Sequence, residues 1–413
     1  MEIMKDVITV VGLGYVGLPL ARAFVDAGFK VFGYDLDHDK VTHAVKHGII
    51  AERLPLHPHS GVYIIAVPTP VDADYKPNLS ALSAACETVG AAMRSGAIVV
   101  LESTVAPGTT ESVCVPILEE SSGLRHRTDF SVGYSPERIN PGDKQHTLAN
   151  TNKLVAGDSR PVTSYLVKLY ENVVTGANVV AAKSIRAAEM SKLVENAQRD
   201  VNIAFVNDVA ATCEALGIDV DEVLDLAGTK WNFARFRPGL VGGHCIGVDP
   251  YYLINASVRR GYYPAVIAKA REYNEGLAPR ICFNILEHLQ NRFNSTQLPS
   301  GIRISIIGGT FKPDVDDFRN SQAVRMAELL SKVARVDICD PYAPEGAYIL
   351  KYETSLPRPV NCVIYAVAHE HGLRYGAEEF RSMMPNGGLF VDIAGLFKRE
   401  EFEPYDIAYW RMG

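Results

Sequence analysis

The stretch VITVVGLGYVGLPLARAFVDAGFKVFGYD, residues 7–35, decides the fold of the N-terminal part of this chain. Apolar runs over 7–11 and 30–34 predict two strands, and the segment between them has the spacing of a helix that ends near Gly28. Three glycines in GxGxxG spacing separate the first strand from the helix: Gly12, Gly14 and Gly17. This order of strand, glycine turn, helix and strand predicts a βαβ unit that binds a dinucleotide.

Asp35 ends the second strand of this unit, eighteen residues after Gly17. A carboxylate at that position hydrogen-bonds the ribose diol of NAD and repels the 2′-phosphate of NADP. We therefore predict NAD as the cofactor, with its pyrophosphate at the N-terminus of the helix. The competing interpretation is a glycine-rich turn in an α/β protein without a cofactor, and the complete context of the motif disfavours it.

The rest of the chain continues the α/β pattern, with a helical middle. β-like runs over 62–67, 97–101 and 129–134 alternate with helical segments, which predicts a parallel sheet with helices on both faces. Residues 184–216 have helical spacing without Gly or Pro, which predicts a long helix with at most one break. Helices of this length often join two lobes and offer a dimer surface, so a homodimer or higher homo-oligomer is expected.

A second α/β segment follows a linker at 294–301, with strands predicted over 302–307 and 360–367. It lacks a complete GxGxxG, so we expect it to hold a different nucleotide. The predicted fold class is α/β, with two Rossmann-like, doubly wound parallel-sheet domains joined by a long central helix. The predicted domains are 1–180, 181–293 and 300–413.

Composition narrows the class of protein. The 413 residues are 47% hydrophobic and 22% charged, as in ordinary globular proteins with two or three domains. The net charge of −7 and the absence of a Lys/Arg cluster argue against a nucleic-acid partner. The first residues do not resemble a signal peptide, and no apolar run approaches the ~20 residues that span a bilayer. We therefore expect a cytoplasmic enzyme without a membrane partner.

The seven cysteines are scattered and form no CxxC pair, so neither a disulfide framework nor a zinc site is predicted, and no metal is expected. Cys245 is distinctive because it lies in GLVGGHCIGVDP, residues 239–250, behind two glycines that we expect to let a substrate carbon reach the sulfur. A thiol beside a hydride acceptor suggests oxidation of an alcohol or aldehyde to an acid through a thiohemiacetal and a thioester. The alternative is that Cys245 is a buried, inert side chain.

Two polar residues follow predicted strands, where parallel sheets bind their ligands. Thr104 lies in ESTVAPGT at 102–109 and could orient a water or the substrate, or it could cap a helix. Glu137 lies in SPERINPG at 135–142 and could hold a catalytic water, or it could be a solvated loop carboxylate.

Charged and amide groups at two further places are candidates for the site. Lys192 and Asn196 share one helix face and could donate to an oxyanion, although an exposed polar stripe is the simpler reading of these two alone. Lys312 and Arg319, in TFKPDVDDFRNS at 310–321, could contact phosphates, or they could balance the nearby aspartates.

Six ordered motifs together resemble the nucleotide-sugar 6-dehydrogenases, the UDP-glucose/UDP-N-acetylhexosamine dehydrogenase family, over nearly the whole chain. They are VGLGYVGLP at 11–19, ESTVAPGTT at 102–110, SPERINPG at 135–142, EMSKLVEN at 189–196, GGHCIGVDP at 242–250 and FKPDVDDFRNS at 311–321. The resemblance implies an N-terminal NAD domain, a long helix at a dimer interface and a C-terminal domain that binds the UDP part. It also implies oxidation of the sugar C6 alcohol to a carboxylate with two NAD per turnover.

The resemblance implies a role for each matching residue. The implied catalytic residues are Cys245, the nucleophile; Lys192 and Asn196, which stabilise the oxyanion; Asp249 and Thr104, which position a water that acts as base; and Glu137, which assists thioester hydrolysis. The implied cofactor-binding residues are Gly12, Gly14, Tyr15, Val16, Gly17, Asp35, Thr69, Thr104 and Arg319. The implied substrate-binding residues are Glu137, Arg138, Lys192, Asn196, Asn232, Arg237, Gly242 and Lys312.

One departure from the family pattern concerns the substrate. UDP-glucose enzymes read GGxCxxKD around the cysteine, whereas this chain has Val248 in place of the lysine. The form HCIGVDP, preceded by KWNF at 230–233, resembles the branch that acts on UDP-GlcNAc or UDP-GalNAc in the synthesis of bacterial Vi-antigen and O-antigen polysaccharides. The sequence leaves UDP-ManNAc, UDP-glucose and the C4 configuration open. A two-electron hydroxyacid-type dehydrogenase and a non-catalytic NAD-binding module also remain as alternatives.

Overall fold

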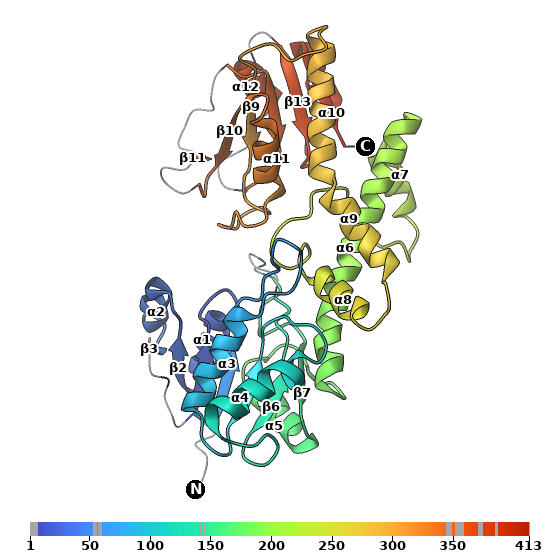
Figure 1. Cartoon of the computed structure of the whole chain (residues 1–413). Helices are drawn as coiled ribbons and strands as arrows, with labels where there is room; N and C mark the ends of the chain where they lie inside the picture. Colours follow the sequence, from blue (N-terminus) through green and yellow to red (C-terminus); the bar gives the residue numbers. More distant parts are fainter. Residues whose placement is uncertain are drawn as a thin grey trace. The chain divides into compact units, whose positions relative to one another are not determined.

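The computed structural model divides into two compact units, which comprise residues 1–195 with 251–263 and residues 196–250 with 264–413 (Figure 1). Two of the three boundaries between these units fall inside the long helix α6 (Ile185–Leu216) and the short helix α8 (Asp249–Val258), and the third falls between Tyr263 and Pro264. The structure describes residues 7–52, 56, 60–139, 143, 145–343, 349–351, 359–370, 375–384 and 387–412.

The first unit is built on a sheet with the strand order β3-β2-β1-β4-β5-β6-β7-β8. Its strands are β1 (Val7–Val11), β2 (Lys30–Tyr34), β3 (Ile50–Glu52), β4 (Val62–Ile65), β5 (Ile98–Leu101), β6 (Ser131–Tyr134), β7 (Lys153–Gly157) and β8 (Val179–Ala181). Neighbouring strands are parallel except for β6 and β7, which are antiparallel. From β1 the strand order runs to β2 and β3 on one side and to β4 and β5 on the other, so the order reverses at β1. The carboxyl end of the strand at such a reversal is the usual ligand position in these sheets.

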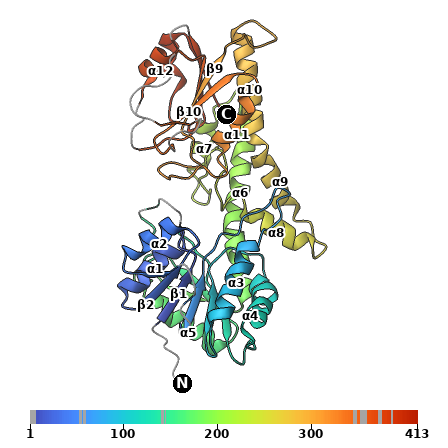
Figure 2. The same cartoon turned by 60° about the vertical axis from the view of Figure 1, so that its left-hand side comes forward.

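Helices cover both faces of this sheet (Figure 2). They are α1 (Gly17–Asp26), α2 (His38–Val45), α3 (Ser80–Ala92), α4 (Val115–Ser122, preceded by a π-helical turn at Thr110–Cys114), α5 (Arg160–Glu171) and the first part of α6. Since successive strand residues point to opposite faces, Val10 and Ile64 pack with α1 and α5, whereas Val11 and Ile65 pack with α3 and α4. The sheet is therefore buried on both faces, as parallel sheets require.

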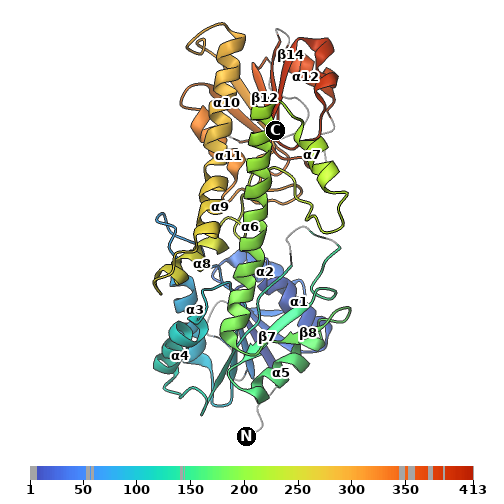
Figure 3. The same ribbon diagram turned by 90° about the vertical axis from the view of Figure 1, so that its right-hand side faces the viewer.

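The second unit contains a fully parallel sheet with the order β11-β10-β9-β12-β13-β14. Its strands are β9 (Arg303–Ile307), β10 (Arg335–Asp340), β11 (Ile349–Lys351), β12 (Cys362–Tyr365), β13 (Gly388–Asp392) and β14 (Ile407–Arg411). Its helices are the second part of α6, α7 (Val220–Ala227), α9 (Ala265–Glu275), α10 (Leu277–Arg292), α11 (Gln322–Leu330) and α12 (Ala377–Met383). One face of the sheet packs on α6, α10 and α11 and the other on α12 (Figure 3).

The two sheets share one local design. In each, a glycine with positive φ follows the first strand, Gly12 at +95° and Gly308 at +84°. The next N–H donates to the aspartate that ends the neighbouring strand, from Leu13 to Asp35 at 2.8 Å in one unit and from Gly309 to Asp340 at 2.6 Å in the other. This geometry confirms the prediction of two Rossmann-like lobes, although the second lacks the full glycine motif.

Several predicted elements are confirmed and others were missed. The strands over 7–11 and 30–34 are found at those bounds, and the long helix runs over 32 residues without a break. The predicted parallel sheets are confirmed apart from the antiparallel pair of β6 and β7. The short edge strands β3, β8 and β11 were not predicted, because three residues carry too little periodicity. In the described part of the chain, no helix is both long and apolar enough to cross a membrane.

Candidate active site

The three glycines of the first turn differ in what surrounds them. A Cβ on Gly12 would lie 2.5 Å from the Ala66 carbonyl oxygen, and one on Gly17 would lie 1.8 Å from the Gly12 carbonyl oxygen. These two positions need glycine for packing. A Cβ on Gly14 would meet nothing within 4 Å, so this glycine leaves open space at the turn. Open space beside a helix start is what the close approach of a pyrophosphate requires.

The start of α1 offers backbone donors to a ligand. Its N-cap residue, Val16, makes no side-chain capping hydrogen bond, and the neighbouring Tyr15 is 57% exposed. The first N–H groups of a helix lack partners within the helix and favour negative charge. The residues at this turn therefore fit the predicted binding of a pyrophosphate.

Asp35 is fixed by the backbone on both sides. Its Oδ2 accepts from the Leu13 N–H at 2.8 Å and its Oδ1 accepts from the Asp37 N–H at 2.9 Å. A carboxylate has about four acceptor positions, so two remain for the hydroxyl groups of a ribose. The side chain is 13% exposed, which leaves it accessible at the end of β2.

Thr69 and Thr104 lie together after β4 and β5. The Thr69 hydroxyl donates to the Thr104 carbonyl oxygen at 2.7 Å, and the Thr69 carbonyl oxygen accepts from the Tyr252 hydroxyl at 2.8 Å. The structure thus brings these two predicted residues to one edge of the sheet, the edge that also carries Asp35 and the glycine turn.

Glu189 holds the loop that follows Thr104. It is completely buried, and its carboxylate accepts from the backbone N–H groups of Gly108 and Thr110 and from the Thr110 hydroxyl at 2.5, 2.9 and 2.7 Å. Burial raises its pKa against the lowering effect of these donors. The sequence analysis included Glu189 in the EMSKLVEN motif but did not predict these contacts. Periodicity does not reveal a partner about 80 residues away.

Glu137 belongs to a buried ionic cluster, not to a solvated loop. Its Oε2 lies 3.1 Å from Lys153 Nζ, and its Oε1 accepts from the N–H groups of Arg138 and Ile139 at 2.6 and 2.7 Å. Lys153 also lies 2.7 Å from Glu102 Oε2. Sequence reasoning missed Lys153 and the role of Glu102, because the strand that Lys153 begins was not predicted and a single lysine in a sequence resembles any surface charge.

The ionisation of this cluster follows from burial and charge. Burial raises the pKa of Glu137, but Lys153 and the two backbone donors outweigh it and hold that pKa below its ordinary value. Burial raises the pKa of Glu102 above its ordinary value despite the same lysine. Burial alone would lower the pKa of Lys153, yet the two carboxylates raise it. Glu137 is therefore ionised at neutral pH.

Arg138 is held within the first unit. Its guanidinium lies 2.9 Å from a carboxylate oxygen of Glu195, and it donates to the Asn152 carbonyl oxygen at 2.9 Å. If Arg138 binds the substrate as predicted, it must do so with the guanidinium N–H groups that these contacts leave over.

In the second unit, Cys245 alone is exposed among the seven cysteines, all of which lie in the described residues. Its carbonyl oxygen accepts from the N–H groups of Val248 and Asp249 at 3.1 and 2.8 Å, which forms a tight turn. The structure gives a reason for the preceding glycines that differs from the one expected. A Cβ on Gly242 would lie 2.8 Å from the Asn320 carbonyl oxygen, and one on Gly243 would lie 2.7 Å from the Phe311 ring. The glycines let the cysteine loop pack against residues 311–320.

Asn196 and Asp249 contact each other directly. The Asn196 amide donates to Asp249 Oδ2 at 2.5 Å, and Asp249 is 3% exposed. Asn196 has a second N–H, so one donor remains for a ligand. Lys192 lies one turn earlier on α6 and is half-buried.

A buried ion pair supports the cysteine loop. Arg271 is 1% exposed and lies 2.8 Å from Asp200, and it also donates to the Ile246 carbonyl oxygen at 3.2 Å. Asn274 donates to the same Asp200 oxygen at 2.8 Å. Sequence reasoning missed this support. A basic residue at helical spacing is usually exposed, so nothing in the pattern distinguished Arg271.

Arg319 and its neighbours form a second ionic group beside the loop. Arg319 lies 2.7 Å from Asp317, and the His244 imidazole lies 3.3 Å from the same carboxylate. Burial and the charge of Arg319 lower the pKa of His244, against the raising effect of Asp317. Lys312 lies above the ring of Phe311, 5.6 Å from its centre.

Two predicted substrate residues lie on the surface of the second unit. Asn232 is exposed, and Arg237 is paired with Asp221 at 3.0 Å and with Asp225. Arg237 thus belongs to an ion-pair network with α7, and no described contact brings these two residues to the Cys245 turn.

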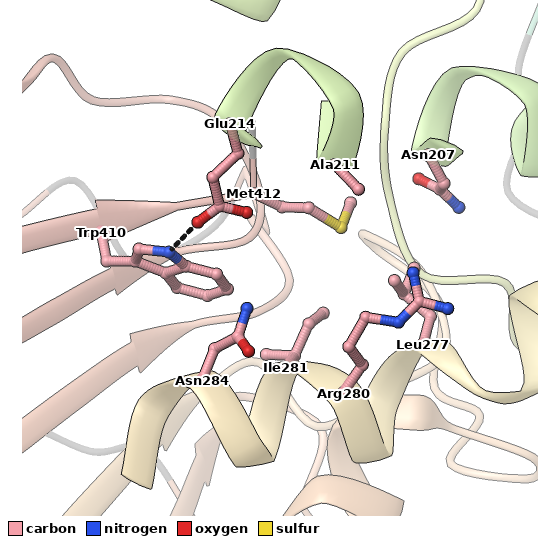
Figure 4. A pocket seen from close by; sticks show the side chains of 9 residues that line it. All are labelled: Asn207, Ala211, Glu214, Leu277, Arg280, Ile281, Asn284, Trp410 and Met412. Atoms are coloured by element: carbon pink, nitrogen blue, oxygen red, sulfur yellow. Dashed lines mark hydrogen bonds between the residues drawn. The ribbon is translucent and has the colours of Figure 1, made fainter. Parts of the chain in front are cut away.

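A small pocket lies elsewhere in the second unit (Figure 4). Its lining comes from α6, α10 and β14, with Glu214 accepting a hydrogen bond from the Trp410 indole at 2.9 Å. It contains none of the predicted site residues. In the described residues, no group of three or more His, Cys, Asp and Glu side chains is placed to hold a metal ion.

Comparison with known proteins assigns a class to this arrangement. Models of the UDP-glucose/GDP-mannose dehydrogenase family match the chain in three parts, as the NAD binding domain over residues 6–54 and 56–174, the central domain over 186–276 and the UDP binding domain over 305–399. The fold and these matches define an NAD-dependent dehydrogenase of nucleotide sugars. The chain belongs to the UDP-glucose/GDP-mannose dehydrogenase family.

Relatives of known name extend over nearly the full length. The UDP-N-acetyl-D-glucosamine 6-dehydrogenase of Pseudomonas aeruginosa is 40% identical, covering 96% of this chain and 99% of the relative. The enzyme of the same name from Salmonella typhi is 37% identical over 95% and 97%. A solved UDP-D-ManNAc dehydrogenase from Pyrococcus horikoshii superimposes with a TM-score of 0.87 at 30% identity, covering 98% and 99%. The predicted family, the cofactor NAD and the class of enzyme are confirmed.

Proposed function

We propose that this protein oxidises the C6 alcohol of a UDP-N-acetylhexosamine, UDP-GlcNAc or UDP-GalNAc, to the uronic acid in two hydride steps. The observation that carries the proposal is Cys245, which is the exposed thiol among seven and lies on a glycine turn closed by the backbone N–H of the buried Asp249. An exposed thiol on a loop held on several sides suits a nucleophile better than an inert core side chain.

Each proposed catalytic residue has a role that follows from its chemistry. Bound NAD supplies the hydride acceptor. Cys245 attacks the aldehyde carbon to give a thiohemiacetal, and the second oxidation leaves a thioester on the sulfur. Lys192 and the remaining N–H of Asn196 donate to the oxyanion on the reacting carbon. Asp249, held by Asn196, acts with Thr104 to position a water that serves as base, and Glu137 assists hydrolysis of the thioester.

The first unit supplies the cofactor site. The turn with Gly12, Gly14 and Gly17 and the start of α1, with Tyr15 and Val16, receive the pyrophosphate, because α1 begins without a side-chain cap. Asp35 accepts from the ribose diol, since it has two acceptor positions left. Thr69 and Thr104 are assigned to the nicotinamide end, and Arg319 is assigned as a further cofactor-binding residue.

The substrate assignment rests on the cysteine loop and on the named relatives. The loop has Val248 where UDP-glucose enzymes have lysine, so this chain lacks a charge that those enzymes use. The relatives from P. aeruginosa and S. typhi are named for UDP-N-acetyl-D-glucosamine. The residues that we propose to bind the substrate are Glu137, Arg138, Lys192, Asn196, Asn232, Arg237, Gly242 and Lys312. We also propose three functional domains, 1–180, 181–293 and 300–413. The third of these domains binds the UDP part of the substrate.

We further propose a homodimer or higher homo-oligomer that works in the cytoplasm and supplies a uronic acid for a bacterial surface polysaccharide. The exposed apolar side chains Val194 and Phe205 on α6 support an oligomer, since a partner helix would cover them. NAD and nucleotide sugars are held inside the cell, which fits a cytoplasmic enzyme.

The deciding experiment measures NADH formed per sugar with UDP-GlcNAc, UDP-GalNAc, UDP-ManNAc and UDP-glucose, for the wild type and Cys245→Ser. Two NADH per N-acetylhexosamine, lost in the variant, is the expected result. One NADH per sugar, or an active Cys245→Ser enzyme, would instead establish a two-electron dehydrogenase that needs no thiol.

A further inference from the structure

Lys153 is the most deeply buried cation among the described residues of the first unit and has no place in the proposed chemistry. It begins β7, and its side chain is 2% exposed. Its ammonium lies 2.7 Å from Glu102 Oε2, 3.1 Å from Glu137 Oε2 and 3.1 Å from the Pro136 carbonyl oxygen. An ammonium has three N–H donors, so these three acceptors use all of them.

The two carboxylates around Lys153 differ in access. The Glu102 side chain is fully buried and accepts from the Tyr170 hydroxyl at 2.5 Å, whereas the Glu137 side chain is 11% exposed. Glu102 therefore faces only protein. Glu137 is the member of the cluster that a water or a substrate can reach. Burying a cation is costly unless it is paired, so a cluster of this kind is weak evidence for stability alone and calls for another reason.

The acceptor positions of Glu137 are almost filled. Oε1 accepts from two backbone N–H groups at 2.6 and 2.7 Å, and Oε2 accepts from Lys153. Of about four acceptor positions on a carboxylate, one remains, on Oε2. A carboxylate fixed in this way can receive one further hydrogen bond in one direction. It is poorly suited to take up a proton, since protonation would oppose the lysine charge and displace one of these donors.

We propose that Lys153, backed by Glu102, is a positioning residue that holds Glu137 as a fixed, ionised acceptor for the water that hydrolyses the thioester. This inference rests on the proposed function. In the step, the water oxygen bonds to the thioester carbon and the carbon–sulfur bond breaks. One water proton ends on the sulfur of Cys245, and the other is released to solvent as the product carboxylic acid ionises. Glu137 orients the water and its own protonation does not change. The lowered pKa of Glu137 agrees with this role.

The test compares the hydrolytic step with the two hydride steps in one enzyme. The variants are Lys153→Met and the double variant Lys153→Met/Glu102→Gln, which removes the charges of Lys153 and Glu102 together and keeps the test valid should the single variant not fold. Lys153→Arg preserves the charge. Tyr170→Phe is the matched control, because it removes a hydrogen bond from Glu102 and leaves Lys153 and Glu137 in place. Intact mass during turnover with NAD and the active UDP-sugar measures the fraction of chains that carry the acyl group on Cys245.

Without the lysine charge, we expect hydrolysis to slow by about tenfold or more while the initial burst of NADH persists, so that the acylated enzyme accumulates. The acid limb of the pH–rate profile for hydrolysis, where the rate falls at low pH, should move to higher pH, because Glu137 loses the cation that keeps it ionised. Lys153→Arg should restore most of the rate, and Tyr170→Phe should leave the acid limb unchanged.

A folded double variant with no accumulated adduct and an unmoved acid limb would overturn the proposal, and so would Tyr170→Phe if it moved the limb equally. Failure of the proposed function has a different signature. There, the wild type itself would form no acyl adduct, or Cys245→Ser would remain active.

Discussion

Asn196 donates a hydrogen bond of 2.5 Å to Asp249, and so joins the α6 turn after Lys192 to the carboxylate four residues beyond Cys245. Asp249 is 3% exposed, and its position therefore depends on its partners. The interpretation of Asn196 as a donor to the substrate alone is thus incomplete. Its side chain also fixes the carboxylate of Asp249, for which we propose a catalytic role.

Replacing Asn196 by Ala should lower kcat by about 10- to 100-fold and lower the free energy of unfolding by about 1–3 kcal/mol, because a buried acceptor loses its donor. Steady-state NADH formation and urea denaturation measure the two effects. Gln198→Ala, at an exposed position of the same helix, is the control and should change neither. A fully active Asn196→Ala enzyme would remove Asn196 and its bond to Asp249 from the mechanism.

The ion pair beneath the cysteine loop gives a stability prediction. Arg271→Met should destabilise the protein by about 3–5 kcal/mol, because Asp200 remains buried without its cation. The double variant Arg271→Met/Asp200→Asn should recover much of this loss. It should still alter the rate at which iodoacetamide alkylates Cys245, since the Ile246 carbonyl loses its donor. If the double variant were as unstable as the single one, the charge pair would not be the cause.

Gly14 allows the cofactor site to be tested apart from folding. A methyl group there would meet nothing within 4 Å, so Gly14→Ala should leave the melting temperature unchanged and raise the KM for NAD by about tenfold or more. Gly12→Ala is the contrasting variant. Its φ of +95° and the nearby Ala66 carbonyl predict a loss of stability. An unchanged KM in Gly14→Ala would mean that the pyrophosphate does not approach this turn.

The sequence predicted the parts of the fold and site that have strong local periodicity. The βαβ unit around Gly12 and Asp35 could be predicted because every feature lies within 29 residues, from 7 to 35. Glu189, Lys153 and Arg271 could not be given their contacts, because each partner is distant in sequence and a buried charge looks the same as an exposed one in a periodic pattern. The glycines before Cys245 were assigned to substrate access, whereas the structure packs them against Phe311 and Asn320.

That packing gives a matched pair of glycine substitutions. Gly243 has φ of +79°, and a Cβ would lie 2.7 Å from the Phe311 ring, whereas Gly239 has open space and no positive φ. Gly243→Ala should therefore cost about 1–3 kcal/mol and reduce the rate of Cys245 alkylation or turnover, and Gly239→Ala should do neither. Differential scanning calorimetry and NADH formation measure the pair. Equal stability of the two variants would show that the loop does not need this backbone conformation.

The His244 imidazole sets a pH dependence beside the same loop. Burial and Arg319 hold its folded pKa below the ordinary value of 6.5, so the unfolded chain binds this proton more readily than the folded protein. The contribution of this group to stability is therefore complete above pH 6.5 and is lost as the pH falls below it. The wild type should lose stability relative to His244→Gln as the pH falls from about 6.5 to about 5, because glutamine does not titrate. Thermal unfolding of both proteins across this range measures the difference. A gap that stays constant with pH would mean that the His244 pKa is the same in the folded and unfolded states.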